Sequence, residues 1–185
     1  DNLAYLMRTE EAPFVPSKNN RDRTSFLDAF PMEYTGNGLG DYREGTLSVK
    51  TKNGHTAVSL SYVSHRIYDG KPVLEGLPAT FGTEAECKTL ELLCEDSVLQ
   101  LQVVLLYTVF NDTDVITRSV KIVNQGKDAL YLTRVLSACI DMDNDDYEMI
   151  TMHGSWARER AIQVRPIMKG KQGVSSVRGE SSHQE

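Results

Sequence analysis

The sequence is short of cysteine and of long apolar runs, and each shortage excludes a class of protein. Its 185 residues include three cysteines, an odd number whose positions lack metal-ligand spacing. We therefore expect buried, reduced thiols, no metal site, no cofactor and a cytoplasmic location. The chain start also lacks the basic-then-apolar pattern of a signal peptide. No apolar stretch approaches the roughly 20 residues that cross a bilayer, so we expect no membrane partner.

Positive charge is scarce as well. The chain has 20 Lys and Arg residues and 26 Asp and Glu residues, which gives a net charge of −6. A nucleic-acid surface needs clustered Lys and Arg, so nucleic acid is not an expected partner.

The 3.6-residue apolar period of helices is missing, and short alternating segments separated by turn residues take its place. We expect strands at residues 46–51, 56–68, 89–95, 99–110, 116–122, 130–141, 147–152, near 162–167, and 174–178. Asn53-Gly54, a favoured two-residue turn, predicts that the first two of these segments pair as a hairpin. The pattern predicts an all-β chain that forms one antiparallel β-sandwich domain over residues 1–185.

Two of these segments have informative faces. In the segment 99–110 one face is apolar and is expected in the core; its residues are Leu99, Leu101, Val103, Leu105 and Tyr107. In the segment 116–122, Arg118 is the exception on the apolar side.

Most motifs that could carry chemistry fail on inspection. The acidic stretch 141–146 resembles the start of a calcium loop, but Asp146 stands where the sharp turn needs Gly. Met152 stands where the loop needs a bidentate Glu, so a solvated acidic loop is favoured. For the polar segment 41–44, Asp-Tyr-Arg-Glu, an ion pair at the start of a strand is a simpler interpretation than a functional site. No nucleophile motif or catalytic triad is present, and we assign no catalytic residue.

The segment 153–160 reads His-Gly-Ser-Trp-Ala-Arg-Glu-Arg and holds the only tryptophan, Trp156. If this segment is extended, Trp156, Arg158 and Arg160 share one face of a strand. An indole beside guanidinium groups suits a flat, hydroxyl-rich ligand. The alternative is a tryptophan packed at a sheet end with its arginines in solvent.

Several ordered segments together carry a family resemblance. They are Glu33-Tyr34, Gly40-Asp41-Tyr42-Arg43, His65-Arg66-Ile67, Gly70-Lys71-Pro72, Leu77-Pro78-Ala79-Thr80, Val115-Ile116-Thr117-Arg118-Ser119, Leu136-Ser137-Ala138, Trp156-Ala157-Arg158-Glu159-Arg160, Arg178-Gly179 and Ser181-Ser182-His183-Gln184. In this order and spacing they resemble the N-terminal β-sandwich of microbial α-galactosidases of glycoside hydrolase family 36, from about Phe14 onward.

The resemblance implies a larger parent enzyme, in which a (β/α)8 barrel and a C-terminal β domain follow the sandwich. Such enzymes remove terminal α-galactose from melibiose, raffinose and related sugars with retention, and their catalytic aspartates lie in the barrel. This implies that the chain holds an incomplete, supersandwich-like domain and is inactive alone. Family members are often tetramers, so the resemblance also implies a homo-oligomer whose sandwich contributes to a substrate pocket, sometimes that of a neighbouring subunit.

Two residues follow from the resemblance as contacts for α-galactoside oligosaccharides. Trp156 matches the substrate-contacting tryptophan of the Trp-Ala-Arg-Glu-Arg motif, and Glu11 matches a loop acid that is typically Asp in the family. Two alternatives remain: a free-standing, non-catalytic carbohydrate-binding module, and a structural fragment that associates through exposed sheet edges.

Overall fold

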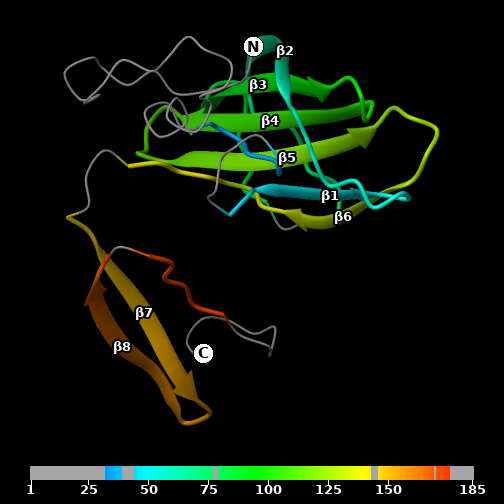
Figure 1. The fold of residues 1–185 in the computed structure, drawn as a ribbon. Helices are drawn as coiled ribbons and strands as arrows, with labels where there is room; N and C mark the ends of the chain where they lie inside the picture. Colours follow the sequence, from blue (N-terminus) through cyan, green and yellow to red (C-terminus); the bar gives the residue numbers. More distant parts are fainter. Residues whose placement is uncertain (1–31, 39–43, 77–78, 143–145, 169, 176–185) are drawn as a thin grey trace, which may run out of the picture. The chain divides into compact units, whose positions relative to one another are not determined.

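The computed structural model describes residues 32–38, 44–76, 79–142, 146–168 and 170–175, which form strands and loops without a helix. The eight strands are β1 (Leu47–Thr51), β2 (Ser61–Asp69), β3 (Cys87–Asp96), β4 (Leu101–Phe110), β5 (Ile116–Asn124), β6 (Leu130–Val135), β7 (Glu148–Ser155) and β8 (Arg158–Pro166) (Figure 1). Every pairing between these strands is antiparallel, so the predicted all-β antiparallel class is confirmed. In these ranges no helix is long and apolar enough to cross a membrane.

The chain divides at Ile140 and Asp141 into two compact units. Strands β1 to β6 belong to the first unit, and β7 and β8 form a hairpin in the second.

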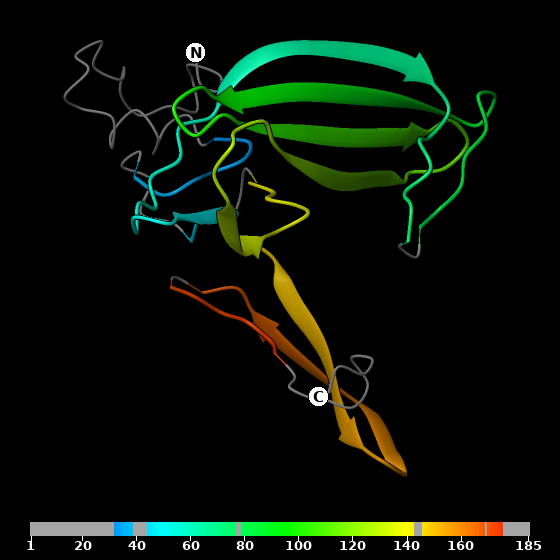
Figure 2. The same cartoon turned by 90° about the vertical axis from the view of Figure 1, so that its right-hand side faces the viewer.

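A four-stranded sheet of order β2-β3-β4-β5 dominates the first unit (Figure 2). Its central strand β4 buries the predicted face: Leu101, Val103 and Leu105 are buried in the core. Leu99 and Tyr107 are partly buried and pack against the same cluster, so the face predicted from the two-residue period is confirmed.

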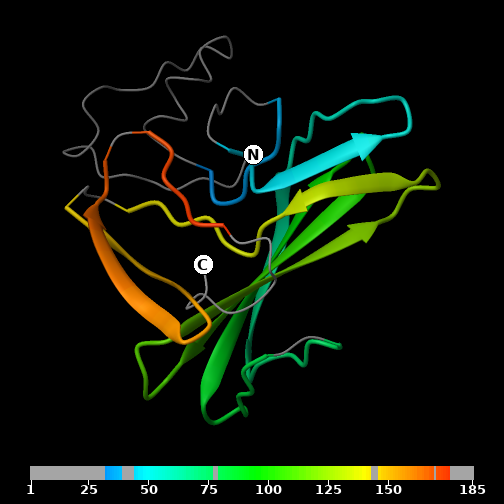
Figure 3. The ribbon, with the colours of Figure 1, turned by 90° about the horizontal axis from the view of Figure 1, so that it is seen from below.

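The second layer of the first unit is a two-stranded ladder of β1 and β6, seen beside the sheet in Figure 3. Leu47 and Val49 of β1 enter the core that the sheet also lines. The core therefore lies between two antiparallel layers, as in a β-sandwich.

The predicted hairpin between residues 46–51 and 56–68 is wrong. A turn does form, with the Gly54 amide donating to the Thr51 carbonyl at 3.0 Å, but β1 pairs with β6 and β2 pairs with β3. The chain after the turn is instead held by loop bonds, because Val58 donates to the Asn37 carbonyl at 2.9 Å and Ser59 to the Asp96 carboxylate at 2.7 Å. Burial of β1 side chains against β4 therefore outweighs the local turn signal.

At one end of the sheet, the described parts of the segment 70–86 lie against the opposite face. The Thr89 hydroxyl donates to the Gly70 carbonyl at 2.6 Å and lies 2.8 Å from the Thr108 hydroxyl, and both threonines are buried. Gly82 lies so close to Cys87 that an added Cβ would meet its sulfur at 2.4 Å. The φ angle of Gly82 is not in the left-handed region, so the backbone conformation does not require glycine here. The close approach to Cys87 does.

Several predicted strands differ in extent from those observed; the strand expected over 56–68, for example, begins at Ser61. The strand expected over 130–141 ends at Val135. Residues 174 and 175 are not in a strand, and the rest of the segment expected over 174–178 lies outside the described residues.

Candidate ligand-binding site

The β7–β8 hairpin carries Trp156 at its tip. The strands pair from Glu148 with Pro166 to Ser155 with Arg158, which leaves Trp156 and Ala157 as a two-residue connection. The Trp156 side chain is 86% exposed, so it does not pack at a sheet end within the described residues. The condition under which Trp156, Arg158 and Arg160 would share one strand face is not met, because the chain reverses at Trp156 and Ala157.

The tip has an unusual backbone. Ala157 has a φ angle of 65° and Arg160 one of 61°, a left-handed region that side chains with a Cβ seldom adopt. The pairing register shifts between His153 and Ser155, where the β8 strand has one extra residue. The Ala157 amide donates to the Glu159 carboxylate at 2.6 Å, which closes the turn with a charged acceptor.

The two faces of the hairpin differ in exposure. One face carries two cross-strand apolar pairs, Ile150 with Val164 and Met152 with Ile162, and all four side chains are between 40% and 67% exposed. On the other face Thr151 is buried and its hydroxyl lies 2.7 Å from His153 Nε2. Clustered exposed apolar side chains mark a surface for association.

This arrangement can bind a sugar without performing acid–base chemistry. An exposed indole can stack on the C–H face of a pyranose ring, and the adjacent Arg158 can donate to hydroxyl oxygens. Stacking supplies affinity and orientation. The tip itself therefore favours binding over proton transfer.

The second predicted contact, Glu11, lies outside the described residues, as do Asp41, Tyr42 and Arg43. Glu44 is described and forms an ion pair with Arg134 at 2.6 Å, next to the start of β1. The ion-pair interpretation therefore holds for Glu44. Residues 143–145 of the acidic stretch also lie outside the described ranges.

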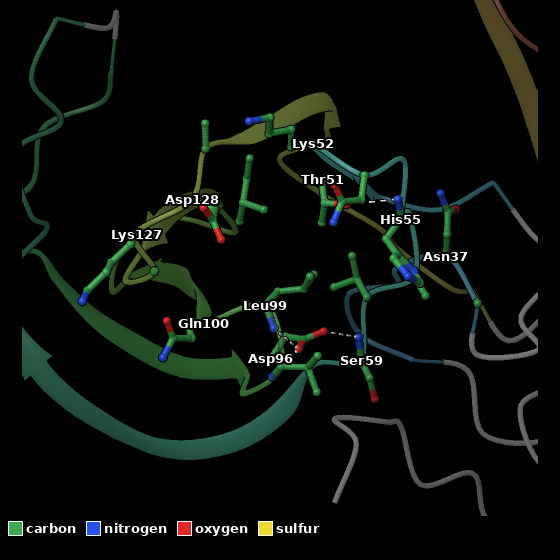
Figure 4. Close-up of a pocket in the computed structure, with 18 residues that line it drawn as sticks. Asn37, Thr51, Lys52, His55, Ser59, Asp96, Leu99, Gln100, Lys127 and Asp128 are labelled. Carbon is green, nitrogen blue, oxygen red and sulfur yellow. Dashed lines mark hydrogen bonds between the residues drawn. The ribbon is translucent and has the colours of Figure 1, made fainter.

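A hollow that the sequence did not predict lies in the first unit (Figure 4). It has a volume of about 750 Å³, and its polar lining includes Lys52, His55, Gln100 and Asp128. Asp96 also lines it, but its carboxylate already accepts hydrogen bonds from the amides of Ser59, Val98 and Leu99. Sequence reasoning missed this hollow because its residues come from loops far apart in the chain.

Among the ion pairs of the described residues, the most buried lies in the first unit. Arg118 donates to Glu33 at 2.5 Å and to the Tyr107 hydroxyl at 3.1 Å, and its other terminal nitrogen donates to the Cys139 carbonyl at 2.6 Å. Burial, reinforced by the Glu33 carboxylate, raises the pKa of Tyr107. Both terminal nitrogens of Arg118 make hydrogen bonds within the first unit, so the cluster stabilises the fold. The cluster also explains why a charged residue, Arg118, stands on the apolar side of β5.

Among the ranges that the structure describes, no three His, Cys, Asp or Glu side chains group in a way that could hold a metal ion.

Comparison with known proteins gives a consistent result. A family profile described as "Glycosyl hydrolase family 36 N-terminal domain" matches residues 4–185. The alpha-galactosidase AgaA of Geobacillus stearothermophilus is 43% identical over 173 residues, which are 93% of this chain and 24% of that protein. The bifunctional alpha-galactosidase/sucrose kinase AgaSK of Mediterraneibacter gnavus is 39% identical over 185 residues, 99% of this chain and 20% of that protein.

Solved structures agree. A crystal structure of an AgaA variant from Geobacillus stearothermophilus in complex with raffinose matches with a TM-score of 0.84 at 43% identity, covering 93% of this chain and 24% of that one. The galactosidase domain of AgaSK matches with a TM-score of 0.80 at 39% identity, covering 85% of this chain and 22% of that one. The chain thus spans about a quarter of the length of these relatives.

Proposed function

Because the chain belongs to the glycosyl hydrolase family 36 N-terminal domain, we propose that it serves as the non-catalytic N-terminal domain of a retaining α-galactosidase. In this proposal it supplies substrate contacts and subunit interfaces, and the catalytic carboxylates lie in a barrel domain outside these 185 residues. The substrates are terminal α-galactosides of the melibiose and raffinose type.

One observation carries the proposal. Trp156, the sole tryptophan, is held at the end of a hairpin with 86% of its side chain exposed. Tryptophan is highly buried on average, and for this exposed indole a sugar ring is the partner that the family suggests. Crystal structures of AgaA variants in complex with raffinose and with stachyose are among the similar structures, which supports oligosaccharides as the ligand class.

We extend the proposal to self-association and location. The exposed apolar face of Ile150, Met152, Ile162 and Val164 suits a subunit interface, since such a face is unfavourable in water. Cys87 and Cys94 are buried thiols outside any disulfide, which supports a cytoplasmic location.

The enzyme assignment is tested by galactose release from raffinose. The full-length polypeptide carrying this domain should release galactose, and the isolated 185-residue chain should not. A full-length polypeptide inactive on every terminal α-galactoside would contradict the assignment. For the interface, Ile150→Asp with Ile162→Asp should reduce the mass measured by sedimentation, whereas Val73→Asp, another exposed apolar position, should not.

A second candidate function, a carbohydrate-binding module that hydrolyses nothing, is favoured by the hollow in the first unit. Its lining combines apolar side chains such as Leu99 with polar groups from Gln100 and Asp128, a composition that suits small ligands. Titration of the 185-residue chain with raffinose separates the two proposals. Binding that Gln100→Ala weakens and Trp156→Ala leaves unchanged would favour the module.

A further inference from the structure

The hairpin tip adopts its conformation without the residues that normally favour it. Two-residue connections between antiparallel strands usually contain Gly, Asn or Asp wherever φ is positive. Here the left-handed position of the connection is occupied by Ala157, and a second left-handed residue, Arg160, lies in β8. A left-handed residue with a Cβ persists only where surrounding contacts hold it, and such residues concentrate at functional sites.

Glu159 supplies such a contact. Its Oε1 accepts a hydrogen bond from the Ala157 amide at 2.6 Å. That N–H belongs to the same peptide group as the Trp156 carbonyl, so fixing it also fixes the backbone that directs the indole. The bond joins an ionised acceptor to a backbone donor, which makes it stronger than a neutral bond of the same geometry.

We infer that Glu159 is a positioning residue for Trp156: it holds the left-handed Ala157 turn so that the indole is presented to the ligand in one orientation. The inference rests on the proposed function, in which Trp156 contacts the galactoside. Its effect on binding is entropic, because an aromatic group that is ordered before the ligand arrives loses less freedom on binding.

The inference separates Glu159 from its neighbours Arg158 and Arg160. A residue that acts only through the indole loses its effect when the indole is absent. A residue that contacts the sugar directly keeps its effect in that background. A residue needed only for folding alters thermal stability. These three roles give different results in one set of variants.

The test uses the full-length polypeptide and raffinose as substrate. Trp156→Ala should raise KM about tenfold, a change that corresponds to the free energy of one lost aromatic contact. Glu159→Ala should raise KM about threefold with kcat and melting temperature unchanged, the size of one hydrogen bond. Glu159→Gln keeps an oxygen acceptor at the same place, so it should restore most of the wild-type KM. In the Trp156→Ala background, Glu159→Ala should change KM by less than about twofold.

Each other outcome contradicts the inference in a recognisable way. If Trp156→Ala leaves KM unchanged, the proposed contact between Trp156 and substrate fails. If Trp156→Ala raises KM and Glu159→Ala does not, the positioning role alone fails. If Glu159→Ala has the same threefold effect with and without Trp156, Glu159 acts directly on the substrate and does not position the indole. If Glu159→Gln is as impaired as Glu159→Ala, an oxygen acceptor at this place is not what holds the turn, and the positioning role as stated here fails.

Discussion

Nη2 of Arg118 lies 2.5 Å from Oε1 of Glu33, and this ion pair is almost enclosed, with side-chain exposures of 14% and 11%. The guanidinium also lies over the Tyr107 ring, 4.7 Å from its centroid. The pair joins β5 to the segment that precedes β1, which are far apart in sequence.

Replacement of Arg118 by Met should therefore destabilise the fold strongly. The change leaves the Glu33 carboxylate buried without its cation, which costs about 3 kcal/mol in free energy of unfolding. Denaturant unfolding of both proteins measures this difference. Arg66→Met is a matched control, since Arg66 also pairs with a glutamate and lies over a tyrosine ring, yet its side chain is 69% exposed. It should change stability little, and equal effects of the two variants would contradict the account.

Gly82→Ala should destabilise the first unit through steric overlap. The new Cβ would lie 2.4 Å from the Cys87 sulfur and 3.0 Å from a Phe110 ring carbon. Overpacking of this kind costs about 1.5 kcal/mol, measurable as a lower unfolding midpoint. Gly173→Ala is the control, because no atom lies within 4 Å of its added Cβ. A Gly82→Ala protein as stable as that control would show that the segment carrying Gly82 does not pack on β3.

Alkaline pH should weaken the first unit over a defined window. Burial raises the pKa of the Cys94 thiol from 9.0 to about 11 and, against a smaller opposing effect of Arg118, the pKa of the Tyr34 hydroxyl from 10.0 to about 12. The folded state keeps these protons when the unfolded state has released them, so stability is full below pH 9.0 and declines toward pH 12. Denaturant unfolding across this range, with reductant present, should show the decline. Cys94→Ala should remove the decline in stability between pH 9.0 and pH 11. If the dependence of stability on pH is unchanged in this variant, the thiol is excluded as a contributor.

Fluorescence should report directly on the hairpin tip, because the 185-residue chain contains a single tryptophan. With 86% of its surface exposed, Trp156 should emit like free tryptophan and be quenched by acrylamide almost as efficiently. A blue-shifted and protected emission in dilute solution would contradict this exposure. Protection that develops only as protein concentration rises would indicate that chains associate at the tip.

Local sequence patterns predicted the parts of this fold that depend on local geometry. The two-residue alternation along β4 identified Leu101, Val103 and Leu105 as core, because strand side chains alternate whatever the strand pairs with. The pairing of β1 with β6 could not be predicted in this way. It joins segments about 80 residues apart, and burial of Leu47 and Val49 decides it over the Asn53-Gly54 turn.

The candidate site likewise has a part that the sequence predicted and a part that it did not. Trp156 was identified from its motif and its family resemblance. The turn that exposes it was missed, because Ala157 and Arg160 are not residues that signal a left-handed backbone. The bond from Ala157 to Glu159 depends on that turn and is equally invisible in a linear pattern.

The central claim is that Trp156 contacts the galactoside, and steady-state kinetics of Trp156→Ala in the full-length polypeptide test it most directly. We predict a KM for raffinose raised about tenfold in a protein that melts like the wild type, since the indole is exposed and supports no core. Phe81→Ala is the control, because Phe81 is an aromatic residue of similar exposure, 82%, in the first unit. Wild-type kinetics for Trp156→Ala, or an equal loss in Phe81→Ala, would contradict the claim.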